Sequence, residues 1–220
     1  MELRNYSLKF NENILFENVN IAFKQNTIHH ILGKNGSGKS SFAKSILGAV
    51  DYKGIIDFGN IEPLVIGSYT NIPLEYKVKD ILNILEKKYD IELYKKFKIS
   101  LDIDSIPSNN KLENLSDGQK QKIKLLFFIS NNPKIIILDE FTASLDKKTS
   151  IEIYKFLNDY VKNFASTIIN ITHNLSDLKY MPGMYHVVEE HKILGNIDMN
   201  DAIDFYINGV NYEEWNKKIS

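Results

Sequence analysis

Apolar and polar positions alternate along the chain in a way that predicts an α/β fold. Short β-branched and apolar runs are separated by runs of helical character from one end to the other, which is typical of strands buried between layers. The first two runs, residues 3–10 and 19–23, predict antiparallel strands joined by a polar turn at 11–13. Further strands are expected at 27–32, 54–58, 64–66, 135–138 and 168–171, and a strand-like stretch at 185–188 continues to 194.

A helical region interrupts this strand order between residues 69 and 133. From 79 to 97 apolar residues recur at mostly helical spacing among lysines and acids. Pro63, Pro73 and Pro107 lie around and inside the region as breakers. We therefore expect a single domain over residues 1–220. It would consist of a core (1–68 and 134–200), a helical subdomain (69–133) and a short C-terminal tail (200–220) that contains Trp215.

Length and charge limit the classes of protein that this pattern can represent. The 220 residues suffice for one well-packed domain, and 43% hydrophobic with 25% charged residues is close to the average of water-soluble globular proteins. The longest apolar runs, 125–129 and 135–138, are far shorter than the roughly 20 residues that cross a bilayer. The first residues do not resemble a secretory signal.

A net charge of -1 argues against nucleic-acid binding, and the absence of cysteine excludes disulfides and thiolate metal sites.

A glycine-rich loop lies between the predicted strand at 27–32 and a helix-type run at 39–47. Its sequence fits G-x-x-x-x-G-K-[ST], the phosphate-binding loop, in the strand-to-helix context that this motif requires. Glycines let backbone N–H groups turn towards an anion, and a helix N-terminus adds partial positive charge. Lys39 is then expected to contact the β- and γ-phosphates, and the Ser40 hydroxyl to bind Mg²⁺. The alternative is a glycine-rich turn with a fortuitous Lys-Ser pair. The candidate nucleotide-binding residues here are Gly33, Lys34, Asn35, Gly36, Ser37, Gly38, Lys39, Ser40 and Ser41.

Two carboxylates stand at the end of a strongly apolar predicted strand. Asp139 and Glu140 directly follow residues 135–138. Because adjacent strand residues point to opposite sides, the two are expected to have different roles. Asp139 is the candidate to hold Mg²⁺ through water, and Glu140 the candidate to polarise the attacking water. The alternative, a solvated acidic turn, is weakened by the presence of the phosphate loop.

Residues 115–119, Leu-Ser-Asp-Gly-Gln, precede a helix-type run at 120–130. Ser116 is a good helix N-cap and Gly118 allows close backbone approach, so this helix start is itself a candidate anion site. The segment resembles the signature motif of the ABC ATPases, the nucleotide-binding subunits of ATP-binding cassette transporters, and the resemblance covers nearly the whole chain. It implies a P-loop ABC ATPase core with a mostly parallel sheet, an antiparallel N-terminal β subdomain and an inserted helical subdomain. It also implies that four residues contact the γ-phosphate held by the opposite subunit of a head-to-tail dimer, namely Ser116, Asp117, Gly118 and Gln119.

Three further positions match the family in the expected order. Residues 143–146 resemble the D-loop, which lies along the dimer interface, and Asp146 would help to shape the partner's water site. His173, just after the strand at 168–171, resembles the switch histidine that contacts the γ-phosphate and the catalytic carboxylate. Phe10 aligns with the aromatic residue that stacks on adenine, and its alternative is a core phenylalanine on the first strand. The resemblance therefore implies Lys39, Glu140 and His173 as catalytic residues.

Two positions depart from the family pattern. A glutamine that contacts Mg²⁺ and links the site to the transmembrane partner is expected after 64–66, but the chain reads Ile66-Gly67-Ser68-Tyr69 there. Ser68 is the hypothesised substitute oxygen. Asp117 stands where the family usually has glycine, which places a carboxylate near the expected γ-phosphate position.

The remaining histidines are expected to be structural. His29 and His30 are adjacent in a predicted strand, so their side chains should diverge and not chelate one metal ion. His186 and His191 are expected to have no partner constellation.

The resemblance implies an ATP-binding and ATP-hydrolysing subunit with ATP and Mg²⁺ as cofactors. Two copies, or this chain and a homologue, would close around two ATP molecules and drive a separate transmembrane permease from the cytoplasmic face of the membrane. The compact helical region and short tail resemble small exporter-type subunits, so we expect export. One alternative is a soluble ABC-type ATPase acting on nucleic acid or ribosomes, although the gap from Lys39 to Ser116 is too short for the coiled coil of chromosome-maintenance relatives. The other is a nucleotide-binding module that has lost hydrolysis.

Overall fold

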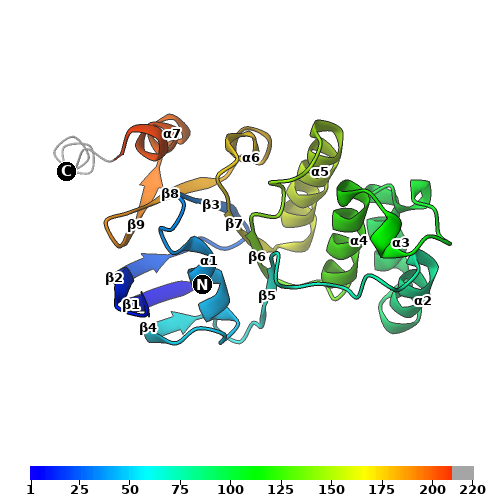
Figure 1. The fold of residues 1–220 in the computed structure, drawn as a ribbon, viewed down its shortest axis with the longest axis horizontal. Coiled ribbons are helices and arrows are strands. Elements are labelled where there is room, and N and C mark those ends of the chain that lie inside the picture. Colours follow the sequence, from blue (N-terminus) through cyan, green and yellow to red (C-terminus); the bar gives the residue numbers. More distant parts are fainter. Residues whose placement is uncertain (210–220) are drawn as a thin grey trace.

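The computed structural model describes residues 1–209, which form a three-stranded and a six-stranded sheet (Figure 1). In the first sheet β1 (Glu2–Phe10) lies between β2 (Asn13–Ala22) and β4 (Tyr52–Asp57), with both pairings antiparallel. The second strand is longer than the predicted 19–23. Asn18 adopts a left-handed backbone (φ 48), and this irregularity interrupts the alternation on which the shorter prediction rested.

The six-stranded sheet has the order β5-β6-β7-β3-β8-β9 and is parallel except for its last strand. Every residue of β3, β6 and β7 is buried, as expected for parallel strands covered on both faces. The predicted α/β class, with an antiparallel N-terminal sheet and a mostly parallel main sheet, is therefore confirmed. The strand bounds are β3 (Ile28–Gly33), β5 (Pro63–Ile66), β6 (Ile135–Asp139), β7 (Thr167–Ile171), β8 (Met184–Glu189) and β9 (Lys192–Ile197).

Three helices of the predicted helical region group at the end of the molecule opposite the three-stranded sheet (Figure 1). They share one apolar cluster with the main sheet, which includes Ile81, Phe97, Leu126, Ile136 and Leu157. The helical region is thus packed continuously onto the core, and its division from the core at 69 and 133 stays a prediction. The helix bounds are α1 (Lys39–Ile46), α2 (Val78–Lys88), α3 (Ile91–Ser100), α4 (Asp117–Ile129), α5 (Lys147–Phe164), α6 (Leu175–Tyr180) and α7 (Met199–Asn208).

The structure divides two of the predicted stretches into separate elements. The helical run at 79–97 is two helices, because the Asp90 carboxylate accepts a hydrogen bond from Leu93 N (2.7 Å) and starts α3 as a new helix. The strand-like stretch at 185–194 is the hairpin of β8 and β9, which turns at Glu190 and His191, both with positive φ (43 and 64). Apolar side chains on both arms conceal this turn in the sequence pattern.

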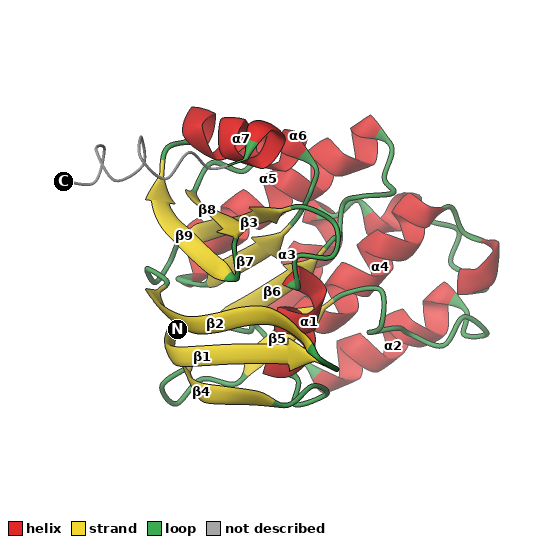
Figure 2. Cartoon of the chain, turned by 60° about the vertical axis from the view of Figure 1, so that its left-hand side comes forward, coloured by secondary structure: helices red, strands yellow, loops and turns green. Residues whose placement is uncertain are grey.

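The C-terminal part of the described chain places α7 beside β8 and β3 (Figure 2). This helix occupies the beginning of the predicted tail, whereas Trp215 lies outside the described residues. None of the helices within residues 1–209 has the length and apolar content that a membrane span requires.

Candidate active site

Two glycines in the left-handed region shape the loop between β3 and α1. Gly36 has φ 82 and Gly38 has φ 95, and a Cβ at Gly38 would also lie 2.9 Å from both Leu15 and Phe16. Gly38 is the N-cap of α1 and supplies no side-chain cap. The first N–H groups of the helix therefore remain available to an anion, which the helix dipole also favours.

The Lys39 ammonium group is buried at the base of this loop. It donates hydrogen bonds to Gly33 O (2.5 Å), Lys34 O (3.0 Å) and Ser37 Oγ (3.5 Å). Burial lowers the pKa of Lys39, while the carboxylates of Glu140 and Asp139 oppose that shift. A cation is thus held against the backbone carbonyls of the loop.

Ser40 and Asp139 bring two oxygens together beside the loop. Ser40, in the first turn of α1, donates a hydrogen bond from its hydroxyl to Asp139 Oδ1 (3.0 Å) at the end of β6. Burial raises the pKa of the Asp139 carboxyl, whereas the hydrogen bond from the Ser40 hydroxyl lowers it. Among the described residues no group of three or more His, Cys, Asp and Glu side chains could hold a metal ion. One hydroxyl and one carboxylate fit Mg²⁺, which completes its shell with waters and substrate phosphates.

Glu140 and His173 form a second pair next to Asp139. Glu140 leaves the strand with a left-handed backbone (φ 52), and its N–H is bonded to Ile171 O of the adjacent β7 (2.9 Å). His173 Nδ1 donates to Glu140 Oε1 (3.2 Å), and both side chains are about two-fifths exposed. The left-handed backbone of Glu140 turns its side chain away from that of Asp139. The two carboxylates therefore lie in separate environments.

Lys39, Ser40 and Glu140 line a cavity of about 640 Å³, a volume within the usual range for small-molecule sites. Asp139 and His173 do not line it, and they adjoin it through their hydrogen bonds with Ser40 and Glu140. Phe10 is 56% exposed at its rim, so the alternative of a core phenylalanine does not hold. Sequence reasoning missed three lining residues. Of these, Lys44 lies on α1, the same helix as Lys39. Asn13 and Leu15 come from the β1–β2 hairpin and belong to no sequence motif. The lining residues are Phe10, Asn13, Leu15, Asn35, Gly36, Gly38, Lys39, Ser40, Ser41, Lys44 and Glu140.

Three predicted loop residues lie beside this cavity rather than in its wall. Gly33 ends β3, and a Cβ there would lie 2.8 Å from Ser37 Oγ. Lys34 and Ser37 line an adjoining pocket against the β8–β9 turn, together with Glu189.

The predicted signature residues do not line the cavity that contains Lys39. Ser116 caps α4 reciprocally with Gln119: Ser116 Oγ accepts from Gln119 N (3.3 Å), and Gln119 Oε1 accepts from Ser116 N (3.1 Å). The Asp117 side chain is 74% exposed and pairs with Lys120 (3.7 Å). The positive charge of Lys120 offsets the negative charge of Asp117, which stands where the family usually has glycine.

Asp146 caps the next helix and adjoins the signature. Its carboxylate accepts hydrogen bonds from Thr149 N (3.0 Å) and Thr149 Oγ1 (2.7 Å), which lower the pKa of Asp146. Thr149 also packs on Gly118, where a Cβ would lie 2.8 Å from Thr149 Oγ1. Gly118 is therefore needed for contact between the starts of α4 and α5, in addition to any role towards phosphate.

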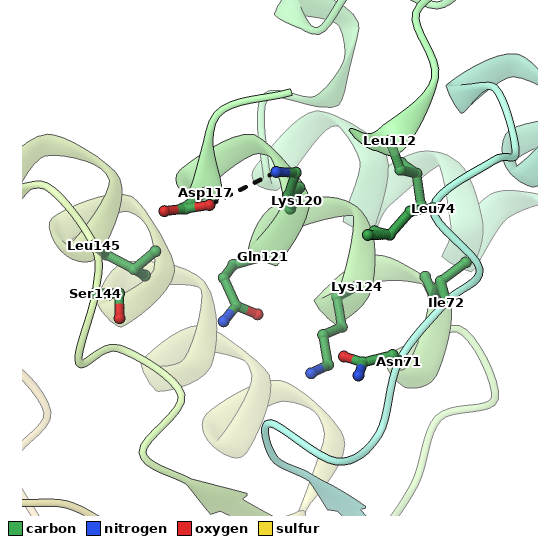
Figure 3. Close-up of a pocket in the computed structure, with 10 residues that line it drawn as sticks. All are labelled: Asn71, Ile72, Leu74, Leu112, Asp117, Lys120, Gln121, Lys124, Ser144 and Leu145. Atoms are coloured by element: carbon green, nitrogen blue, oxygen red, sulfur yellow. Dashed lines mark ion pairs between the residues drawn. The ribbon is translucent and has the colours of Figure 1, made fainter. Parts of the chain in front are cut away.

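A second hollow of about 330 Å³ lies between residues 71–74, α4 and the turn at 144–145 (Figure 3). Lys124 and Asn71 point towards each other at one end, and Asp117 stands at the start of α4 (Figure 3). Lys124 Nζ donates to Gly67 O (2.5 Å) and so connects α4 with the segment after β5. Ser68 in that segment is exposed and does not line the nucleotide cavity, which gives no support to it as the substitute oxygen.

One prediction about the histidines is wrong. His186 does have a partner, because β3 and β8 are neighbours: His186 Nε2 lies 2.9 Å from His29 Nδ1. Burial lowers the pKa of both, that of His186 to about 3, and so disfavours the charged form of each ring. His30 points elsewhere and donates to Met181 O (2.6 Å), in agreement with the predicted divergence.

Comparisons with known proteins agree on one family. The sequence model described as "ABC transporter" matches residues 16–143. The "Probable peptide export ATP-binding protein YydI" of Bacillus subtilis (strain 168) is 41% identical over 94% of this chain and 100% of that protein. The "Zinc import ATP-binding protein ZnuC" of Rickettsia conorii is 32% identical over 80% of this chain and 76% of that protein.

The fold is found again in a solved structure described as the ATP binding subunit of an ABC transporter. It superposes with a TM-score of 0.77 over 99% of this chain and 98% of that one, at 16% sequence identity. At this identity the match concerns the fold.

Proposed function

This chain belongs to the ABC transporter family, and we propose that it hydrolyses ATP in the cavity around Lys39 to drive a separate membrane permease. As a member of the family it is an ATP-binding subunit and an ATPase. One observation carries the assignment of the site. Lys39, Ser40 and Glu140 line one cavity, and hydrogen bonds join Asp139 to Ser40 and His173 to Glu140, although these residues come from three separate stretches of the chain.

Each group has a role that its surroundings support. Lys39 and the N–H groups at the start of α1 bind the phosphates, with the loop residues from Gly33 to Ser41 as their frame. Ser40 and Asp139 hold Mg²⁺, which when bound neutralises charge on the phosphates. Glu140 orients and polarises the attacking water, and His173 holds Glu140 in place and faces the γ-phosphate. Phe10 stacks on the base, because its exposed ring stands at the cavity rim.

We propose that the site is completed by a second ATPase subunit, either a copy of this chain or a homologue. Ser116, Asp117, Gly118 and Gln119 lie outside the cavity of their own chain, and Ser116 and Asp117 are solvent-exposed, whereas Gly118 is buried. An isologous pair would place each signature over the other subunit's cavity, with Asp146 along the interface. The Asp117–Lys120 pair supports this arrangement, since it limits repulsion of the γ-phosphate. The permease would hold the pair at the cytoplasmic face of the membrane.

For direction we propose export, with a peptide as the substrate class. This proposal is supported by the 41% sequence identity to a peptide export ATP-binding protein over that protein's whole length. The identity to the zinc import protein is lower, 32%, and extends over only 76% of that protein. Substrate choice itself would lie with the permease.

Transport by inverted membrane vesicles tests this proposal. With the ATPase side outward, added ATP is expected to drive labelled peptides from a mixed pool into vesicles that carry the chain and its permease. Vesicles with Glu140→Gln are the matched control and should take up none. ATP-driven uptake by right-side-out vesicles loaded with ATP would instead indicate import and overturn the proposed direction.

A further inference from the structure

Asp177, on α6, is a fully buried carboxylate that accepts hydrogen bonds from three uncharged side chains. The Thr142 hydroxyl lies 2.8 Å from one of its oxygens and 2.9 Å from the other. The Tyr154 hydroxyl donates to Oδ1 (2.6 Å) and Asn170 Nδ2 to Oδ2 (2.9 Å). Burying a carboxylate is costly unless hydrogen bonds satisfy it, so the donors and the carboxylate fix one another in place.

Thr142 connects this carboxylate to the turn that carries Glu140. It is buried two residues after Glu140, and a backbone bond from Ala143 N to Glu140 O (3.3 Å) closes the same turn. A hydroxyl has one hydrogen to donate, and here it points to Asp177. Glu140 has a left-handed backbone (φ 52), a conformation that persists only where its surroundings maintain it. The contact between Thr142 and Asp177 is part of those surroundings.

The same carboxylate holds the segment that carries His173 from both sides. Asn170, on β7, lies three residues before His173 and donates to Asp177. Asn174 directly follows His173, and its carbonyl accepts a hydrogen bond from Asp177 N (3.0 Å). Asn174 Nδ2 also donates to the Tyr154 hydroxyl (3.4 Å), which in turn donates to Asp177. Both neighbours of His173 in the chain are therefore tied to one buried group.

We propose that Asp177 is a positioning residue for the Glu140–His173 pair, because its carboxylate holds the turn at 140–143 against the segment at 170–174. The proposal rests on the proposed function of the cavity. The two side chains are about two-fifths exposed, so they depend on the placement of their backbones and less on packing. The backbone bond from Glu140 N to Ile171 O (2.9 Å) is one link between the two segments, and the Asp177 network is a second.

The variant Asp177→Asn tests this role because it keeps the shape of the side chain and removes its charge. Its amide group presents donors where a donor already points, so at least one contact of the network is lost. We expect the full chain to turn over ATP about 10-fold to 100-fold more slowly, since small misplacements of reacting groups cost this much. ATP affinity, measured by isothermal titration, should equal that of the wild type, because the phosphate loop lies outside the network.

Combining this change with Glu140→Gln separates positioning from a general defect of the fold. If Asp177 acts through Glu140, its substitution should cost nothing further once the Glu140 carboxylate is gone. Phosphate release in a single turnover measures both variants. A further loss of 10-fold to 100-fold in the double variant would overturn the positioning role, because a fold defect lowers the rate by the same factor in either background.

Thr142→Val serves as the second variant in case Asp177→Asn does not fold. It removes one donor, leaves Tyr154 and Asn170 on the carboxylate, and should also slow turnover without changing ATP affinity. Asp159→Asn makes the same chemical change at an exposed position of α5 and should retain the wild-type rate.

The outcomes distinguish this role from the function on which it rests. Wild-type turnover in folded Asp177→Asn, or in Thr142→Val where the first variant does not fold, would overturn the role of Asp177 and leave the proposed function intact. Failure of the wild-type chain to bind or turn over ATP would instead overturn the proposed function.

Discussion

Replacing Glu140 by glutamine is expected to lower ATP turnover by about 10²-fold to 10⁴-fold while ATP still binds. The change removes the carboxylate charge that polarises water and keeps the shape of the side chain. It also weakens the contact with His173 Nδ1 (3.2 Å). Binding persists because the phosphates are held by Lys39 and the loop, which the substitution does not alter. Phosphate release and nucleotide binding, measured on the same preparation, separate the two effects.

Glu62→Gln is the matched control for this variant. Glu62 is exposed in the loop before β5 and lies outside the cavity, so the same chemical change there should leave turnover at the wild-type rate. Undiminished turnover in Glu140→Gln would remove Glu140 from its proposed role.

Replacing Lys39 by alanine is expected to weaken ATP binding by about 10-fold to 150-fold. A hydrogen bond to a charged group contributes roughly 1.5–3 kcal/mol, and each 1.4 kcal/mol is about tenfold in affinity. The substitution removes the buried cation and leaves the carbonyls of Gly33 and Lys34 without their donor. Isothermal titration with ATP measures the loss, and circular dichroism checks that the fold is retained.

Lys53→Ala provides the comparison, because Lys53 is an exposed lysine on β4 away from the cavity. Its ATP affinity should equal that of the wild type. If Lys39→Ala bound ATP equally well, the glycine-rich loop would be a structural turn and not a phosphate site.

Local chemistry made part of this site predictable from the sequence. The spacing from Gly33 to Ser40 defines a strand, a loop and a helix start within one short stretch, so Lys39 and Ser40 could be assigned without tertiary information. Asp139 and Glu140 were predictable because an apolar run such as 135–138 fits a fully buried strand. The residues that follow such a strand lie where its carboxyl-terminal end leaves the buried part of the sheet.

Contacts between distant segments account for what the sequence did not reveal. His186 meets His29 only because β8 pairs with β3. The exposure of Phe10 depends on where the β1–β2 hairpin ends relative to α1. Helix α5 was also not predicted, although Ile153, Leu157 and Val161 are buried at a spacing of four. Its apolar positions are interleaved with aromatic and polar ones, which weakens the periodic signal.

We propose that this chain forms half of an ATP-driven pair attached to a permease. Native mass spectrometry of tagged Glu140→Gln, purified from native membranes in mild detergent with ATP and Mg²⁺, tests it most directly. We expect a particle with two ATPase subunits, two ATP molecules and a multi-span membrane protein, and the masses show whether the second subunit is identical. A single ATPase subunit without a membrane partner, or one associated with ribosomes, would exclude a permease-bound pair.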